Sequence, residues 1–162
     1  SVTSSVPSTI LADELTYDFH IMLRTELEAK IVDGTLEVTE LPDAWNAGMK
    51  EYLGVDVPDD AQGVLQDVHW SSGQIGTFCN YTIGNIMAAQ LFETAINDNP
   101  GIQTALNGAD YEPLRSWLTD KVAQHGRRYP RDELLKNATG RALDPEPYIA
   151  HLTHKFSEIY EL

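Results

Sequence analysis

The stretch 15–34, LTYDFHIMLRTELEAKIVDG, decides the fold class, because its apolar residues recur with the period of an α-helix. Ser8 or Thr9 is expected to cap the start of the helix, and Gly34 is expected to end it, which predicts roughly six turns. The apolar stripe of this helix consists of Leu15, Phe19, Met22, Leu23, Leu27 and Ile31.

The same spacing dominates the rest of the chain. A second helix is expected from Pro42 to just before Gly54, and a third from Asp59 or Asp60 to about His69. Later helices are expected at about 80–97, in a short piece after DNPG (98–101), over 111–124, between Pro130 and Gly140, and from Pro145 to the end. TLEVTE at 35–40 is too short and acidic for a strand.

These patterns predict an all-α protein with a single domain over 1–162, in which residues 1–9 are flexible. No internal repeat is visible, and no linker is long enough to divide the chain. The serine- and glycine-rich segment SSGQIG at 71–76 is expected to be a loop between two helices.

The charge balance excludes some partners. The chain has 25 acidic and 11 basic residues, a formal net charge of −14, which argues against binding nucleic acid. The sequence contains no run of about 18 apolar residues, so no membrane span is predicted. It also shows no leader pattern at its start, so a cytoplasmic setting is the default. Dispersed acidic residues with few lysines slightly favour a halophilic protein over an ordinary acidic bacterial one. Cys79 is the only cysteine, so no internal disulfide is possible.

A polar ridge accompanies the apolar stripe of the first helix. Thr16, His20, Arg24 and Glu28 are four residues apart and therefore share one face. Spacing alone favours a solvent-facing row with a weak Arg24–Glu28 pair. The alternative is a ridge that lines a cleft, with Arg24 binding a carboxylate in bidentate fashion, through two parallel N–H groups.

The segment 62–76, QGVLQDVHWSSGQIG, raises a question about chemistry. On a helix Asp67 and His69 do not face each other, whereas Gln66 and His69 share a face. His69 lies at a helix end, and Tyr81 begins the next helix, so imidazole and phenol could both donate hydrogen bonds to a developing oxyanion. From the residues alone, a site and a packed helix end are equally supported.

Other catalytic chemistries find less support. Cys79 has no general base beside it in the sequence, and no nucleophile-elbow pattern occurs. No HExxH motif is present, and His151 and His154 lack an obvious third ligand. The sequence therefore predicts no metal site in this chain.

GVLQDVHW at 63–70 matches the GxxQDxHW signature of the carboxypeptidase Taq family, the M32 zinc metallocarboxypeptidases. The resemblance extends from about residue 10 to the C-terminus. Segments 12–28, 41–55, 80–95 and 138–162 resemble successive later segments of that family, in the same order.

The resemblance implies a zincin-like, groove-forming helical fold and the removal of single C-terminal residues from peptides. It also implies homodimers and a zinc or cobalt ion, held by the two histidines of HExxH and a later glutamate. Because those motifs are absent here, the resemblance implies the C-terminal portion of such an enzyme. Its partner would be the missing N-terminal metal-binding part, and the isolated fragment is expected to be inactive.

Roles for six residues follow from the resemblance. His69 is expected to hydrogen-bond the substrate carbonyl or the tetrahedral oxyanion, and Tyr81 is a second candidate for that role. Asp67 is expected to orient the loop or helix end, and Arg24 to bind the free carboxylate of the substrate. Gln66 and Trp70 complete the signature as substrate-binding positions.

The segment 76–81 departs from the family pattern. The chain reads GTFCNY at 76–81, where family members commonly read GYFPTY, so Thr77 replaces an aromatic hydroxyl and Cys79 replaces a proline. Either Tyr81 alone is the phenolic donor, or contacts to substrate differ. The alternative function is a free-standing helical module for interaction or dimerisation, without catalysis.

Overall fold

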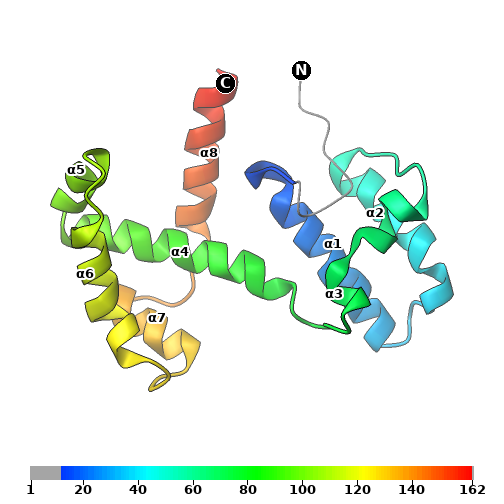
Figure 1. The fold of residues 1–162 in the computed structure, drawn as a ribbon, viewed down its shortest axis with the longest axis horizontal. Coiled ribbons are helices and arrows are strands. Elements are labelled where there is room, and N and C mark those ends of the chain that lie inside the picture. Colours follow the sequence, from blue (N-terminus) through cyan, green and yellow to red (C-terminus); the bar gives the residue numbers. More distant parts are fainter. Residues whose placement is uncertain (1–11, 162) are drawn as a thin grey trace. The chain divides into compact units, whose positions relative to one another are not determined.

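The computed structural model describes residues 12–161, which form helices joined by turns, with no strand among them (Figure 1). The predicted all-α class is confirmed. The chain splits into two compact units, Ser1–Thr82 and Ile83–Leu162. The expected flexibility of residues 1–9 falls outside the described residues, and the single domain over 1–162 stays a prediction.

The first helix, α1, spans Glu14–Val32 and is shorter than predicted. Asp13 caps it, because its side chain accepts a hydrogen bond from the Thr16 backbone N–H at 2.8 Å. The expected caps Ser8 and Thr9 precede this start and lie outside the described residues. Gly34 follows the helix with a φ of +76°, the left-handed conformation that glycine adopts at little cost.

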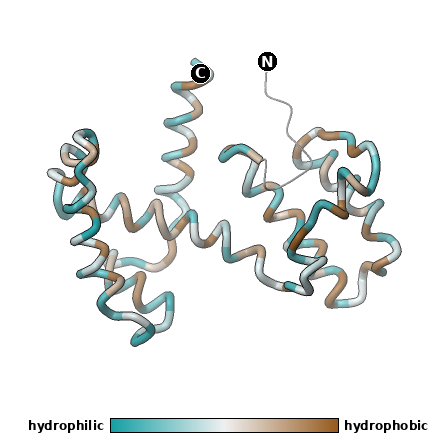
Figure 2. The backbone as a smooth tube through the Cα atoms, viewed as in Figure 1, coloured by the Kyte–Doolittle hydropathy of each residue, from teal (hydrophilic) through white to brown (hydrophobic). Residues whose placement is uncertain are grey.

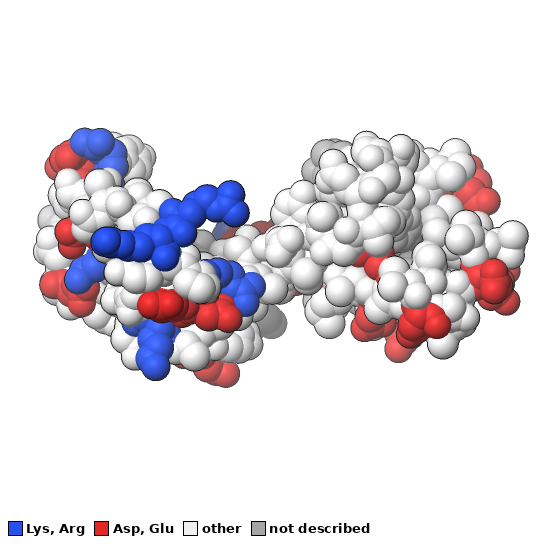
Figure 3. Space-filling model, turned by 90° about the horizontal axis from the view of Figure 1, so that it is seen from below, with Lys and Arg blue, Asp and Glu red and all other residues white. Residues whose placement is uncertain are grey.

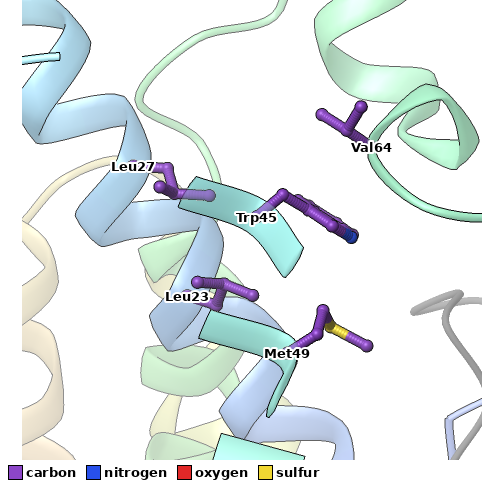
Figure 4. Close-up of a cluster of buried hydrophobic side chains, with 5 residues drawn as sticks. All are labelled: Leu23, Leu27, Trp45, Met49 and Val64. Carbon is purple, nitrogen blue, oxygen red and sulfur yellow. The ribbon is translucent and has the colours of Figure 1, made fainter. Parts of the chain in front are cut away.

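Helix α2 (Leu41–Leu53) packs on α1 and forms the core of the first unit. It begins with Pro42 in its first turn and ends at Gly54 in the left-handed conformation, as the sequence predicts. The buried side chains of this core are Leu23 and Leu27 of α1, Trp45 and Met49 of α2, and Val64 of the segment that follows (Figure 4).

The polar ridge of α1 is buried, which corrects the expectation of a solvent-facing row. His20, Arg24 and Glu28 are 0%, 1% and 4% exposed. Apolar residues of the predicted stripe divide instead, since Leu23 and Leu27 are buried while Leu15, Phe19 and Met22 are exposed. Arg24 and Glu28 have polar partners in Asp67 and Trp70, and the rings of Trp45 and Phe78 also lie against Arg24.

The predicted third helix, from Asp59 or Asp60 to His69, is wrong. Two short 3₁₀ turns, η3 (Asp60–Gln62) and η4 (Val64–Gln66), precede a single helical turn, α3 (Val68–Ser71). Asp67 divides them: its backbone is extended, and its carboxylate caps α3. Residues 38–40 of TLEVTE form another 3₁₀ turn, η2 (Val38–Glu40), and no strand.

Helix α4 (Cys79–Asp98) follows the predicted 80–97 closely and begins in the first unit. The second unit continues with α5 (Gly101–Asn107), α6 (Glu112–Lys121), η5 (Ala123–His125), α7 (Arg131–Thr139) and α8 (Glu146–Tyr160). Gln90 of α4 is buried and ties this unit together. Its amide donates to the Thr139 hydroxyl at 3.1 Å and the Ala142 carbonyl at 3.0 Å, and accepts from the Asp144 N–H at 3.0 Å.

Helix α8 only partly buries the stripe predicted for it. Tyr148 is buried, whereas Ile149, Ile159 and Tyr160 are exposed among the described residues. Apolar and polar residues alternate along its length (Figure 2). This helix therefore presents apolar side chains that the second unit does not cover.

Charge is unevenly divided between the two units. Residues 1–82 contain 14 acidic and three basic residues, whereas residues 83–162 contain 11 acidic and eight basic ones. On the face shown in Figure 3, Lys and Arg gather over the second unit. The acidic residues are thus spread over both units, but the formal net charge is −11 in the first unit (14 acidic, three basic) and −3 in the second (11 acidic, eight basic).

Candidate active site

Five of the six residues assigned to the site come together in the first unit, around the single turn of α3. They are Arg24, Asp67, His69, Trp70 and Tyr81. The sixth, Gln66, directly precedes Asp67 but is exposed, with its side-chain amide donating to the Ala61 carbonyl.

His69 and Tyr81 contact each other through their polar atoms. The His69 Nε2 lies 2.9 Å from the Tyr81 hydroxyl oxygen, and the two rings meet edge to face at 5.7 Å. The centre of the imidazole ring also lies 4.7 Å from the centre of the buried Phe78 ring. The His69 side chain is 24% exposed and Tyr81 is 42% exposed, so solvent reaches both side chains in this chain.

Asp67 fixes the start of α3 with one carboxylate. Its Oδ1 accepts hydrogen bonds from the backbone N–H groups of His69 and Trp70, both at 2.9 Å. The same oxygen is 3.9 Å from His69 Nδ1, which is too long for a hydrogen bond. Asp67 therefore contacts His69 through the backbone N–H and not through the ring, and its role as an orienter of the helix end stays a prediction.

Arg24 is buried beneath the α3 turn, next to Asp67. Its Nε donates to Asp67 Oδ2 at 2.7 Å, and its Nη1 donates to the His20 carbonyl at 3.0 Å. The guanidinium also lies 4.4 Å from the centre of the Trp45 ring. Burial lowers the pKa of Arg24, while the hydrogen bond and charge of Asp67 oppose that effect. This position differs from that expected of a receptor for the substrate carboxylate, because Arg24 is buried and already holds Asp67.

Glu28 holds the segment that follows α3. Its Oε1 accepts the Trp70 indole N–H at 2.9 Å, and its Oε2 accepts the Gly76 backbone N–H at 3.0 Å. The indole meets the Trp45 ring edge to face at 5.8 Å. Glu28 was not singled out for the site, although its spacing from Arg24 placed both on one face of α1.

Residues 2–156 match the family model of the carboxypeptidase Taq (M32) metallopeptidases. The chain belongs to this family. The resemblance read from GVLQDVHW at 63–70 is thereby confirmed, as is the all-α class that it implied.

Named relatives of this M32 chain are carboxypeptidases. It is 40% identical to "Carboxypeptidase 1" of Bacillus subtilis over 164 residues, covering 100% of this chain and 33% of the relative. It is 38% identical to "Thermostable carboxypeptidase 1" of Pyrococcus furiosus, covering 90% of this chain and 29% of the relative.

Solved structures agree with this assignment. The M32 carboxypeptidase from Deinococcus radiodurans R1 superposes with a TM-score of 0.94 at 42% identity, over 98% of this chain and 32% of that one. Metallocarboxypeptidase 1 of Trypanosoma cruzi gives a TM-score of 0.87 at 40% identity, over 91% of this chain and 30% of that one. This M32 chain thus spans about a third of the length of the relatives it matches.

Two further groups of the M32 chain lie near the site: His20, which the sequence placed on the polar ridge without a role, and Tyr17, which it did not single out. The His20 ring is fully buried, and its nitrogens have no hydrogen-bond partner among the described residues. Burial, and then repulsion by Arg24, lowers the pKa of His20 to about 4, so this ring is neutral at pH 7. Burial, followed by the charges of Tyr81 and Asp18, raises the pKa of Tyr17. Only the position of these rings in the folded unit reveals them.

M32 carboxypeptidases are metallopeptidases. Within residues 12–161, however, no three His, Cys, Asp or Glu side chains converge on one point. His154 of α8 lies 3.5 Å from Glu158 one turn on, and this is an exposed pair. The described side chains therefore do not fit a metal site. Among the same residues, no helix is long and apolar enough to cross a bilayer.

Thr77 and Cys79, which depart from the family pattern, flank Phe78. The Thr77 hydroxyl is buried and has no hydrogen-bond partner within the described part of the chain. The Cys79 thiol is exposed and lies 4.0 Å from the Gly76 carbonyl oxygen. Tyr81 is the phenol that contacts His69, and its role as the phenolic donor stays a prediction.

Proposed function

We propose that this chain is the C-terminal part of a metal-dependent carboxypeptidase, which removes single residues from the C-termini of peptides. In this proposal His69 and Tyr81 stabilise the oxygen of the scissile carbonyl. The observation that carries it is the 2.9 Å contact between His69 Nε2 and the Tyr81 hydroxyl in a pair that solvent reaches.

The chemistry of the pair suits a developing negative charge. Attack of water on a peptide carbonyl moves charge onto the carbonyl oxygen, and pre-positioned N–H or O–H donors stabilise that charge strongly. When His69 Nε2 carries the proton, it donates to the Tyr81 oxygen, and the phenolic O–H is free to donate to the substrate. When the Tyr81 O–H instead donates to Nε2, the phenolic O–H must turn away from the imidazole before it can donate to the substrate oxygen.

The other signature residues support the site in different ways. Gln66 is exposed and can reach a peptide, whereas the Trp70 indole N–H is held by Glu28, so only its ring is offered to substrate. The zinc or cobalt ion belongs, in this proposal, to the missing N-terminal part, because the described residues do not form a site for it. The isolated chain is accordingly expected to be inactive.

His69→Ala in the complete polypeptide tests this proposal. Removing one oxyanion donor costs about 10²–10³ in kcat in a well-studied hydrolase, so a fall of that size is expected. KM and metal content should change little. His154→Ala is the matched control, because that imidazole is exposed on α8. An unchanged kcat for His69→Ala would rule out the role of this pair.

A helical module for interaction or homodimerisation is the second candidate, favoured by the exposed apolar residues of α8. A reading frame with HExxH upstream of Ser1 would support the enzyme, whereas a start codon beside Ser1 would support the module. Sedimentation of the 162-residue chain, with and without Ile159→Glu, measures whether this helix mediates self-association.

A further inference from the structure

We propose that Arg24 and Glu28 of α1 are positioning residues. Arg24 fixes the start of the turn that carries His69 and Trp70, and Glu28 fixes its end. This inference rests on the proposed function and deepens it. The buried side chains of Arg24, Glu28 and Asp67 are called here the inner polar layer. They touch no substrate atom in this proposal, and they act through α3 and the segment that leads to Tyr81.

The helix that carries His69 is too short to orient itself. It has four residues, Val68–Ser71, and an isolated helical turn of that length is unstable in water. The segment 71–76 that follows is exposed throughout, and the next buried apolar side chain is Phe78. The Trp70 ring packs against Trp45 and Phe78, and hydrogen bonds from buried side chains add the directional anchoring that this ring contact does not give.

Arg24 anchors the first end of the turn. The side chains of Arg24 and Asp67 are 1% and 2% exposed, and the 2.7 Å contact between them joins α1 to the N-terminus of α3. Asp67 uses its second oxygen for the backbone N–H groups of His69 and Trp70. A displacement of Arg24 is thus transmitted to the backbone that carries the imidazole.

Glu28 anchors the second end. One carboxylate accepts N–H groups from Trp70 and Gly76, the two residues that bracket the exposed segment. Fixing both brackets sets where the chain enters Phe78 and α4, and so where the Tyr81 hydroxyl lies. Neither contact involves a protein cation, so the geometry of the two accepted hydrogen bonds is what this carboxylate provides.

Glu28→Gln and Glu28→Ala in the complete polypeptide give a graded test. Glutamine keeps one acceptor oxygen for two N–H groups, and alanine keeps none. We expect kcat to fall by roughly 10-fold for Gln and more for Ala, since a small misplacement of catalytic groups can cost up to 10²-fold. KM and metal content should stay near their wild-type values. Glu26→Gln is the control, because this exposed glutamate of α1 bonds the Tyr52 hydroxyl.

Trp70→Phe provides a second variant that keeps a packed ring and removes only the indole N–H. If Glu28 acts through Trp70, the double variant Glu28→Gln/Trp70→Phe loses less than the product of the two single losses. Independent effects that multiply would contradict this part of the inference. Arg24→Lys, which keeps the charge but loses the guanidinium geometry, should reduce kcat less than Arg24→Met.

A measurement on the 162-residue chain separates this inference from the proposed function. With isotope-labelled histidine, NMR reports the His69 ring through its Hε1 and Nε2 resonances. Glu28→Gln and Arg24→Met should shift or broaden these resonances, while Glu26→Gln should leave them in place. If the His69 resonances and kcat are both unchanged in the inner-layer variants although His69→Ala is impaired, the inference fails and the proposed function stands.

Discussion

Asp67→Ala should destabilise the first unit by more than any exposed ion-pair substitution, because it strands a buried guanidinium. Asp67 accepts one hydrogen bond from Arg24 and two from backbone N–H groups of α3. Breaking one side of a buried ion pair costs about 3–5 kcal/mol. Loss of a helix cap adds about 1 kcal/mol. The expected total is therefore about 5 kcal/mol.

Two related variants divide this total. Asp67→Asn keeps the capping oxygen but not the charge, so it should be about 1 kcal/mol less destabilising than Asp67→Ala. Arg24→Met/Asp67→Ala removes both charges, and it should be less destabilising than the sum of its single variants by up to about 3 kcal/mol. Asp56→Ala is the control, because its pair with Lys50 is exposed and is worth less than about 1 kcal/mol.

Urea unfolding followed by tryptophan fluorescence measures these differences. The first unit contains Trp45 and Trp70, and the second contains Trp117. In a Trp117→Phe background the signal therefore reports the first unit alone. If Asp67→Ala unfolds within about 1 kcal/mol of Asp56→Ala, the buried pair does not anchor the site, and the reasoning from burial is refuted.

Two further predictions concern pH and packing. The pKa of His20 is about 4 in the folded state and 6.5 in the unfolded state, so between these pH values only the unfolded state takes up a proton. The contribution of His20 to stability is therefore complete above pH 6.5 and is lost as the pH falls toward 4. The free energy of unfolding should fall by about 2 kcal/mol between pH 7 and pH 5. In urea titrations at several pH values, His20→Leu should remove this part of the pH dependence. If the free energy of unfolding falls equally with pH in the wild-type protein and in His20→Leu, the prediction is contradicted. Leu27→Ala should destabilise the first unit by about 2–5 kcal/mol, and Val32→Ala, at the exposed end of the same helix, by less than about 0.5 kcal/mol, as measured by the urea midpoint. Similar midpoints for the two would show that Leu27 is not in the core.

Local sequence signals placed most helices correctly. Pro42 and Gly54 bound α2, and α4 follows the predicted 80–97, because proline, glycine and apolar spacing act within a few residues. The third helix failed for an equally local reason. The Asp67 carboxylate bonds the N–H groups of His69 and Trp70, and this bonding starts a new helix instead of continuing one.

The buried ridge could not be predicted from α1 itself. Its burial depends on partners far along the chain, since Asp67 is 43 residues from Arg24 and Trp70 is 42 residues from Glu28. The helical period gives the face on which Arg24 and Glu28 lie, but it does not reveal what covers that face. The sequence placed His69 and Tyr81 at the two ends of a short loop, which makes their contact possible, but it did not predict the contact itself.

The most direct measurement is a structure of the complete polypeptide with a peptide phosphinate, whose tetrahedral phosphorus resembles the attacked carbonyl. The proposal predicts that His69 Nε2 or the Tyr81 hydroxyl lies within about 2.7–3.1 Å of a phosphinyl oxygen. If both groups lie beyond hydrogen-bonding reach of the inhibitor, or if packing seals the His69 ring away from it, the proposed role of the pair is contradicted.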